Sequence, residues 1–175
     1  MKRRIVVCGK AGSGKDFFRD YLSLQLVVDV SFTTRPPREG EVEGYTYKYV
    51  SDRDFQNLLL GNHLQEHVEF NGWFYATGKE SWINSDVFIM TPSGIGQLTK
   101  KDRLKCTVVY FDIELGTRRH RLEKRSDFDK VNRRIHADEE DFLDFNDFDI
   151  RVTNPEYDVD QLYSLINLYD KCATQ

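Results

Sequence analysis

The chain has 175 residues, of which 39% are hydrophobic and 31% are charged, and its formal net charge is −4 at pH 7. This composition indicates a globular protein long enough to bury a core. The acidic balance argues against a general nucleic-acid-binding protein, which needs a basic surface. No apolar run approaches the roughly 18–20 residues that span a membrane. The cysteines Cys8, Cys106 and Cys172 lie far apart, which favours free thiols and a cytoplasmic location.

The first predicted strand, residues 4–8, leads into a glycine-rich turn. The turn reads Gly9, Lys10, Ala11, Gly12, Ser13, Gly14, Lys15, Asp16. Helical spacing of apolar residues follows over about 14–26. This order is the context of the phosphate-binding P-loop, G-x-x-x-x-G-K-[ST], whose backbone N–H groups surround phosphate oxygens at a helix N-terminus. Lys15 is predicted to reach the outer phosphates. The alternative is an ordinary glycine-rich turn with a surface lysine.

Further along, predicted strands alternate with predicted helices. Strands are expected at 26–32, 45–50, 64–70, 73–77, 87–91, 107–112 and 150–152, and helices at 52–60, 115–124, 131–145 and 159–169. Ser51 is predicted to cap a helix, and Asn71-Gly72 to turn a hairpin. Continuous apolar runs such as 87–91 are typical of buried parallel strands. The pattern therefore indicates an α/β fold with a parallel sheet, and residues 32–79 are expected to form a mostly β insertion.

Residues 31–47 closely resemble the segment of guanylate kinases that binds the nucleoside monophosphate (NMP). The family pattern there is S-x-T-T-R-x-P-R-x-G-E-x-x-G-x-x-Y, and the chain follows it from Ser31 to Tyr47. Residues 64–77 are similar to the family's F-x-E and G-x-x-Y-G-[ST] segments, and residues 121–135 to its R-L-x-x-R and R-[LI] segments. The resemblance covers most of the chain. It implies a P-loop NTPase parallel sheet with flanking helices, an inserted NMP-binding lobe and a helical lid.

This resemblance also implies how the chain is divided. A single guanylate-kinase-like domain would span residues 1–175. Its core would comprise about 1–31, 80–115 and 146–175, its NMP-binding lobe about 32–79, and its lid about 116–145.

The resemblance implies a set of residues that bind the acceptor nucleotide. They are Ser31, Arg35, Arg38, Glu41, Tyr47, Glu66, Tyr75, Thr77 and Thr91. Arg35 and Arg38 would hold the acceptor phosphate, because a guanidinium group binds phosphate bidentately; a solvated basic turn is the alternative. Glu66 and Ser31 match the residues that recognise guanine. A carboxylate can accept from both N1–H and the 2-amino group of guanine, which adenine cannot offer together.

The basic helices carry the residues expected to act on the transferring group. Arg121, Arg125 and Arg134 match the family's lid arginines. Together with Lys15 they would neutralise the negative charge of the phosphoryl group during its transfer. The alternative is a basic helix face that is simply exposed to solvent. For Arg118 and Arg119 a lid role and an exposed helix face are equally favoured. The implied cofactors are ATP, held by residues 9–16, and Mg²⁺.

The chain departs from the family at two places. Asp16 replaces the P-loop Ser or Thr that contacts magnesium. Ile89 and Thr91 stand where the family carries carboxylates at a strand end, one of which helps to read guanine. We link the two changes in one hypothesis. A carboxylate near magnesium has moved from the strand end to Asp16, which makes Asp16 the predicted metal ligand, and Thr91 remains as a hydroxyl.

The expected activity is phosphoryl transfer from ATP·Mg²⁺ to a nucleoside monophosphate, foremost GMP or dGMP. One alternative is a broader deoxynucleoside-monophosphate kinase of bacteriophage type or a sugar-phosphate kinase of the same fold. The other is a non-catalytic guanylate-kinase-like module that binds proteins. The expected partners are small nucleotides, without nucleic acid or membrane, and the chain is expected to be a monomer or a homodimer.

Overall fold

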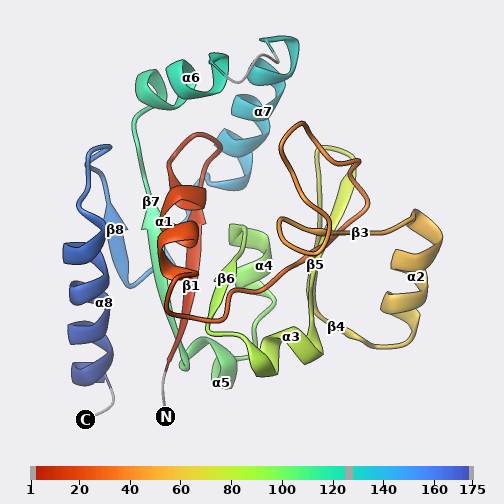
Figure 1. Ribbon diagram of the computed structural model, residues 1–175, viewed down its shortest axis with the longest axis horizontal. Coiled ribbons are helices and arrows are strands. Elements are labelled where there is room, and N and C mark those ends of the chain that lie inside the picture. Colours follow the sequence, from red (N-terminus) through yellow and green to blue (C-terminus); the bar gives the residue numbers. More distant parts are fainter. Residues whose placement is uncertain (1–2, 125–127, 174–175) are drawn as a thin grey trace.

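A computed structural model shows how these segments are arranged (Figure 1). It describes residues 3–124 and 128–173, without the side chains of residues 128–130, 133 and 134. The strands are β1 (Arg4–Gly9), β2 (Phe32–Thr33), β3 (Lys48–Tyr49), β4 (Leu64–Phe70), β5 (Trp73–Gly78), β6 (Val87–Ile89), β7 (Cys106–Phe111) and β8 (Ile150–Val152). The helices are α1 (Lys15–Leu22), α2 (Asp52–Leu60), α3 (Lys79–Asn84), α4 (Pro92–Gly96), α5 (Lys100–Arg103), α6 (Leu115–Glu123), α7 (Phe128–Asp141) and α8 (Val159–Ala173).

The central sheet consists of four parallel strands in the order β6-β1-β7-β8. Successive residues of β1 face opposite sides, as strand geometry requires. Val7 packs in one cluster with Phe18 of α1 and Ile166 of α8, whereas Val6 packs in another with Trp82 of α3. Every residue of β7 is buried, which explains its continuous apolar sequence. The predicted α/β fold with a parallel sheet is confirmed.

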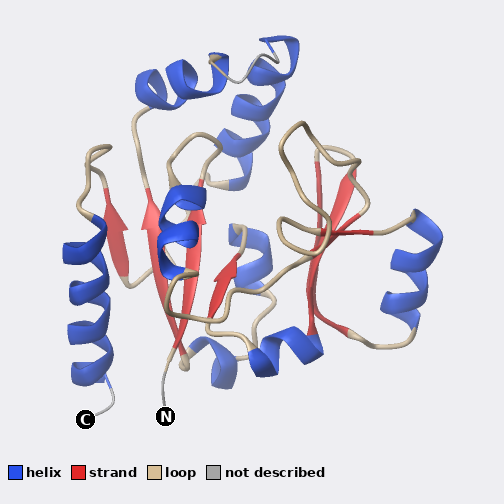
Figure 2. Cartoon of the chain, viewed as in Figure 1, coloured by secondary structure: helices blue, strands red, loops and turns tan. Residues whose placement is uncertain are grey.

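A second, smaller sheet lies beside the first and carries α2 on its outer side (Figure 2). Its order is β3-β2-β5-β4, and β4 pairs with β5 as an antiparallel hairpin. Phe55 of α2 packs on Leu64 and Ala76 in a core cluster of its own. The hairpin turns at Asn71 and Gly72, whose φ angles are 55° and 76°. The predicted turn is therefore confirmed, and this sheet has a hydrophobic core separate from that of the central sheet.

Helices α6 and α7 pack against each other beyond the carboxyl ends of the central strands (Figure 1). Leu122 of α6 joins Val131 and Ile135 of α7 in a hydrophobic cluster. Ala11, from the turn after β1, belongs to the same cluster. The helical pair is thus anchored on the glycine-rich turn by apolar packing.

Arg118 of α6 is buried, whereas its neighbour Arg119 is only half-buried. The Arg118 side chain is 2% exposed, and its Nη2 donates a hydrogen bond of 2.7 Å to Glu139. Its Nη1 lies 4.0 Å from Asp138, and its Nε donates to the carbonyl of Ile113 at 2.9 Å. A solvated helix face is therefore the wrong interpretation of Arg118, because the cation is paired with carboxylates on α7.

The segment 26–32 differs most from its prediction. It does not form a strand of the central sheet; only Val28 makes an isolated bridge, to Val87. Phe32 already belongs to β2 in the other sheet. The apolar run is interrupted by Asp29, whose carboxylate accepts hydrogen bonds from serine hydroxyls while the chain crosses from one sheet to the other. The predicted strand at 26–32 is therefore wrong, although Val28 does pair with the edge of the central sheet.

Other boundaries also shift. The predicted strand at 45–50 shrinks to β3, because the amide of Gly44 donates to the carbonyl of Tyr47 and closes a turn. Helix α1 ends at Leu22, four residues early, and α7 begins and ends earlier than 131–145. The short helices α3, α4 and α5 were not predicted. Within residues 3–124 and 128–173, no helix has the length and apolar character needed to cross a membrane.

Replacing Gly72 by Ala should lower the free energy of unfolding by about 1 kcal/mol, because a Cβ is unfavourable at its left-handed φ of 76°. The matched control is Gly96→Ala in α4, where the backbone is outside that region and the added Cβ meets open space. That change should be neutral or stabilise by up to about 1 kcal/mol. Urea unfolding of both variants measures the difference, and equal effects would contradict the account of the hairpin turn.

Replacing Arg118 by Ala should lower the free energy of unfolding by about 3–5 kcal/mol, since it removes the buried cation that pairs with Asp138 and Glu139 on α7. Arg119→Ala is the control on the same helix. It removes one exposed hydrogen bond, to Asn132, and should cost less than about 1 kcal/mol. Denaturant unfolding followed by circular dichroism gives both values. Similar losses in the two variants would show that burial does not distinguish the two arginines.

Candidate functional site

The turn between β1 and α1 has the backbone shape of an anion-binding loop. Gly12 and Gly14 have φ angles of 76° and 96°, and Gly14 is the N-cap of α1. A Cβ on Gly12 would lie 2.7 Å from the carbonyl oxygen of Arg118, so this position requires glycine. Lys15 and Asp16 are the first two residues of α1, half-buried and exposed respectively. The unpaired N–H groups at the start of such a helix attract phosphate.

Helices α6 and α7 reach this loop through polar contacts. The amide of Ala11 donates a hydrogen bond of 2.7 Å to Asp138, and Nζ of Lys10 lies 2.6 Å from Glu139. Arg121 donates from Nη1 to the carbonyl of Gly12 at 3.3 Å. The structure therefore brings one predicted lid arginine to the loop. Asp138 was not anticipated from the sequence, where it belongs to an ordinary acidic run.

Two of the predicted lid arginines cannot be placed in the same way. Arg125 lies outside the described residues. Arg134 is part of α7, and its side chain lies outside the described part of the chain.

Arg35, two residues after the end of β2, is held in place by Glu41. Its Nη2 donates to Glu41 at 2.9 Å, its guanidinium lies over the ring of Tyr47 at 5.4 Å, and its side chain is 6% exposed. Burial alone would raise the pKa of Glu41. Hydrogen bonds from the Arg38 amide, the Tyr49 hydroxyl and Arg35 outweigh it and hold the pKa below its usual value. Glu41 therefore stays charged and orients Arg35.

The buried Nε of Arg35 has no hydrogen-bond partner within the part of the chain that the structure describes. Tyr47 and Tyr75 pack edge to face at 6.0 Å beside this group. Burial, and then the charge of Asp16, raises the pKa of Tyr47 well above its usual value. Arg19 of α1 donates from Nη2 to the carbonyl of Tyr45 at 2.7 Å, so α1 contacts the segment that precedes β3.

Glu66 is a buried carboxylate with two hydrogen bonds on one oxygen. Its Oε1 accepts from the amide of Thr77 at 3.0 Å and from the Thr77 hydroxyl at 2.8 Å. Burial raises the pKa of Glu66, which these hydrogen bonds partly oppose. A Cβ on Gly94 would lie 2.8 Å from Glu66 Oε2 and 3.7 Å from Thr91 Oγ1. Glu66 and Thr91 therefore both lie beside Gly94, and Thr77 is hydrogen-bonded to Glu66.

Asp29 is a buried residue of this region that was not predicted from the sequence. It is 6% exposed, and its carboxylate accepts hydrogen bonds from the hydroxyls of Ser31 and Ser81. Its charge also raises the pKa of Glu66. The available signal was a single acidic residue inside the apolar run Val27, Val28, Asp29, Val30.

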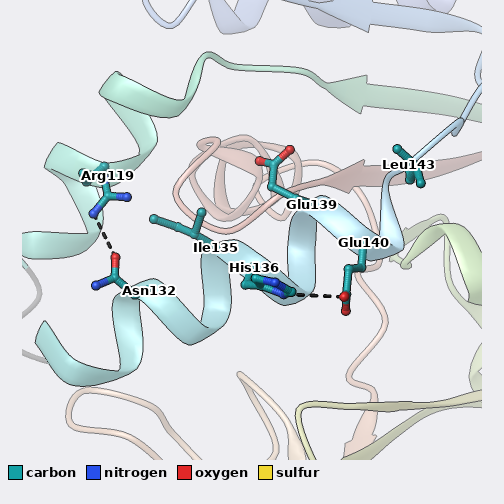
Figure 3. A pocket seen from close by; sticks show the side chains of 7 residues that line it. All are labelled: Arg119, Asn132, Ile135, His136, Glu139, Glu140 and Leu143. Atoms are coloured by element: carbon teal, nitrogen blue, oxygen red, sulfur yellow. Dashed lines mark hydrogen bonds and ion pairs between the residues drawn. The ribbon is translucent and has the colours of Figure 1, made fainter.

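A surface hollow lies on the outer side of α6 and α7 (Figure 3). It is lined by Arg119, Asn132, Ile135, His136, Glu139, Glu140 and Leu143, none of which was predicted as a site residue. Arg119 donates to Asn132, and His136 faces Glu140, whereas Glu139 pairs with Arg118 and with Lys10 of the loop. The polar groups of the hollow are therefore engaged by other residues of the protein.

The comparisons with known proteins agree with this geometry. The family model described as Guanylate kinase matches residues 1–168. A guanylate kinase of Rubrobacter xylanophilus is 31% identical over 167 residues, covering 89% of this chain and 87% of its own. One of Desulfitobacterium hafniense is 31% identical over 185 residues, covering 98% and 92% respectively.

A solved structure supports the fold. The crystal structure of guanylate kinase from Anaplasma phagocytophilum superposes with a TM-score of 0.67 at 19% identity, over 97% of this chain and 88% of that one. At this identity the likeness concerns the fold alone. Together with the match of the family model across almost all of the sequence, these findings show that the chain belongs to the guanylate kinase family.

Proposed function

We propose that this protein transfers the γ-phosphoryl group of ATP to GMP or dGMP. The products are ADP and the guanosine diphosphate. The observation that carries the proposal is a P-loop whose helix α1 contacts the segment between β2 and β3, together with a buried arginine, Arg35, in that segment and a buried carboxylate, Glu66, in β4. In the reaction, the bond from the γ-phosphorus to the bridging oxygen breaks and a bond to an oxygen of the acceptor phosphate forms. That oxygen is already anionic, so the reaction needs no general base.

The P-loop supplies the donor site in this proposal. Backbone N–H groups of residues 9–16 bind the triphosphate, and Lys15 neutralises its outer charges. Arg121 contacts the loop at Gly12 and is placed to add positive charge beside the transferring group. We assign Arg125 and Arg134 the same role, on the family's motif. The lid would comprise residues 116–145.

The second sheet supplies the acceptor site, within residues 32–79. Arg35 and Arg38 bind the phosphate of the acceptor, and the hydroxyls of Tyr47 and Tyr75 donate to it. Positioning accounts for most of the catalysis of phosphoryl transfer, so Glu41 contributes by fixing Arg35. Ser31, Glu66, Thr77 and Thr91 surround the base.

Magnesium is the cofactor implied by the family, and the donor atoms present suit it. Mg²⁺ prefers carboxylate, phosphate and water oxygens, and the exposed carboxylate of Asp16 follows Lys15 at the start of α1. No group of three or more acidic, histidine or cysteine side chains among the described residues forms a metal cage. Asp16 would therefore share the ion with phosphate and water oxygens. When bound, the ion neutralises charge on the outer phosphates.

A cytoplasmic location and a monomeric or homodimeric state stay predictions. Free Cys8 and Cys106, both buried, are in keeping with a reducing compartment.

An ADP-release assay with ATP·Mg²⁺ and a panel of acceptors tests the activity. The panel contains GMP, dGMP, AMP, dAMP, CMP, dCMP, UMP, dTMP and ribose phosphates. We expect kcat/KM for GMP and dGMP to exceed that for AMP by about 100-fold or more, because adenine leaves Glu66 without its N–H partners. Comparable rates with several deoxynucleotides would favour the broader kinase, since Ile89 and Thr91 replace carboxylates at the end of β6. GMP binding without turnover of any acceptor would favour the protein-binding module.

Replacing Asp16 by Asn should raise the magnesium concentration needed for half-maximal rate and lower kcat by about tenfold, the scale of losing a group that positions a metal. Asp20→Asn is the matched control. Asp20 lies on the same helix, where it pairs with Arg19, and its replacement should leave the magnesium dependence unchanged. Titration of MgCl₂ at fixed ATP measures both. Wild-type behaviour of the Asp16 variant would contradict its assignment as a metal ligand.

A further inference from the structure

The second sheet contacts the rest of the molecule at more than its two chain connections. The chain enters this sheet at β2 and leaves it after β5, and the carboxylate of Asp29 accepts a hydrogen bond at each place, from Ser31 before β2 and from Ser81 in α3. A further contact lies elsewhere, where Nη2 of Arg19 donates to the carbonyl of Tyr45 at 2.7 Å. Arg19 belongs to α1, so this contact joins the helix that follows the glycine-rich loop to the segment before β3.

The surroundings of Arg19 commit its side chain to this contact. The residue is only 9% exposed although it carries a charge, and a buried cation needs partners. Its guanidinium lies over the ring of Tyr45, 5.2 Å from the ring centre, and its Nη1 donates to Asp20 at 3.0 Å. Tyr45 therefore offers the cation both a carbonyl oxygen and an aromatic face.

Tyr45 belongs to a turn whose backbone is hydrogen-bonded within itself. The amides of Tyr45 and Thr46 donate to the carbonyl of Val42 at 3.2 and 2.8 Å, and the amide of Val42 donates to the Thr46 hydroxyl. The amide of Gly44 donates to the carbonyl of Tyr47. These bonds tie residues 42–47 together, so a contact that holds Tyr45 also restrains the residues on either side of the turn.

The residues on either side of this turn are the ones that hold Arg35. Glu41 precedes the turn and accepts from Arg35 at 2.9 Å, and Tyr47 follows it with its ring centre 5.4 Å from the Arg35 guanidinium. At the other end of the contact, Arg19 lies four residues after Lys15 in α1, about 6 Å along the helix axis. A continuous series of contacts thus runs from Lys15 through Arg19 to Arg35.

We propose that Arg19 is a positioning residue that fixes Arg35 relative to Lys15 by holding the turn at residues 42–46 against α1. This inference rests on the proposed function, in which Lys15 binds the phosphoryl donor and Arg35 binds the acceptor phosphate. Loss of the contact leaves both groups in place within their own sites but lets the separation of the two sites vary. In-line transfer depends on that separation, so Arg19 acts on the transfer step and not on the binding of either nucleotide alone.

Arg19→Met tests the proposal, because methionine keeps an unbranched side chain and removes the charge and the N–H groups. We expect kcat with ATP and GMP to fall about tenfold or more, the effect of losing a hydrogen bond from a charged group and misplacing the reacting groups. The Kd of ATP alone and of GMP alone, measured by calorimetry, should each change less than about twofold, because the nucleotides bind to other residues. Arg19→Lys keeps a cationic donor and should recover kcat to within about threefold of wild type.

Asp20→Ala is the matched control, since it removes the other hydrogen bond of Arg19 and leaves the contact with Tyr45. It should keep the wild-type kcat. Tyr45→Ala removes the ring but keeps the carbonyl oxygen, so it should lower kcat by a smaller factor than Arg19→Met. The double variant Arg19→Met, Tyr45→Ala should be no slower than Arg19→Met, because both changes act on one contact. Additive losses in the double variant would overturn the proposal.

A distance measurement tests the same contact without turnover. Cys172 in α8 is an exposed thiol and the other two thiols are buried, so one spin label can be attached there and a second at Arg53→Cys, an exposed position of α2. Arg19→Met should broaden the distribution of distances between these labels in the nucleotide-free protein. Asp20→Ala should leave the distribution as in wild type.

An unchanged distribution in Arg19→Met overturns the proposal, and so does a loss of nucleotide affinity as large as the loss in kcat, which would indicate a structural role. If Arg19→Met does not fold, wild-type kcat and distances in Tyr45→Ala overturn it. A wild-type chain that neither binds nor phosphorylates GMP overturns the proposed function itself, and the label distances still report on the contact. GMP turnover with wild-type kcat in Arg19→Met overturns this inference alone.

Discussion

The carboxylates of α7 hold the P-loop against helices α6 and α7, and the structure around the loop depends on this interaction. Asp138 accepts from the amide of Ala11, and Glu139 pairs with both Lys10 and the buried Arg118. A buried cation is tolerated only when it is paired, so Arg118 requires these partners. The same packing places the backbone of α6 against Gly12, which explains why one lid arginine reaches the loop.

The acceptor side is built differently, as a second sheet with its own hydrophobic core. Phe55, Leu64 and Ala76 form that core without residues of the central sheet. The link to the rest of the molecule is polar: Asp29 binds hydroxyls on both connections, and Arg19 of α1 donates to the carbonyl of Tyr45. In-line phosphoryl transfer depends on the separation of donor and acceptor, so in the proposed reaction these hydrogen bonds would contribute to that separation.

Local chemistry explains what could be predicted from the sequence. The P-loop turn, the Ser51 cap and the Asn71-Gly72 hairpin depend on residues a few positions apart, and all three are present. The features that sequence reasoning missed depend on interactions between residues that are far apart in the chain. Asp29 and Ser81 are 52 positions apart, and nothing in the apolar run around Asp29 indicates its role. Arg118 and Arg119 are adjacent residues of one type, so only packing separates the buried cation from the half-buried one.

Buried carboxyl groups outside β6 would give this chain, on the proposed function, a way to select guanine without carboxylates at the end of β6. Asp29 and Glu66 are both buried, and the charge of Asp29 raises the pKa of Glu66. Hydrogen bonds from hydroxyls and an amide keep both groups satisfied in the folded protein. In the proposed base site, Glu66 would act as an acceptor for the N–H donors of guanine and would disfavour adenine, whose N1 lone pair would point at a carboxylate. On that proposal, base selection depends on which buried side chains present acceptors, and the particular strand that carries them matters less.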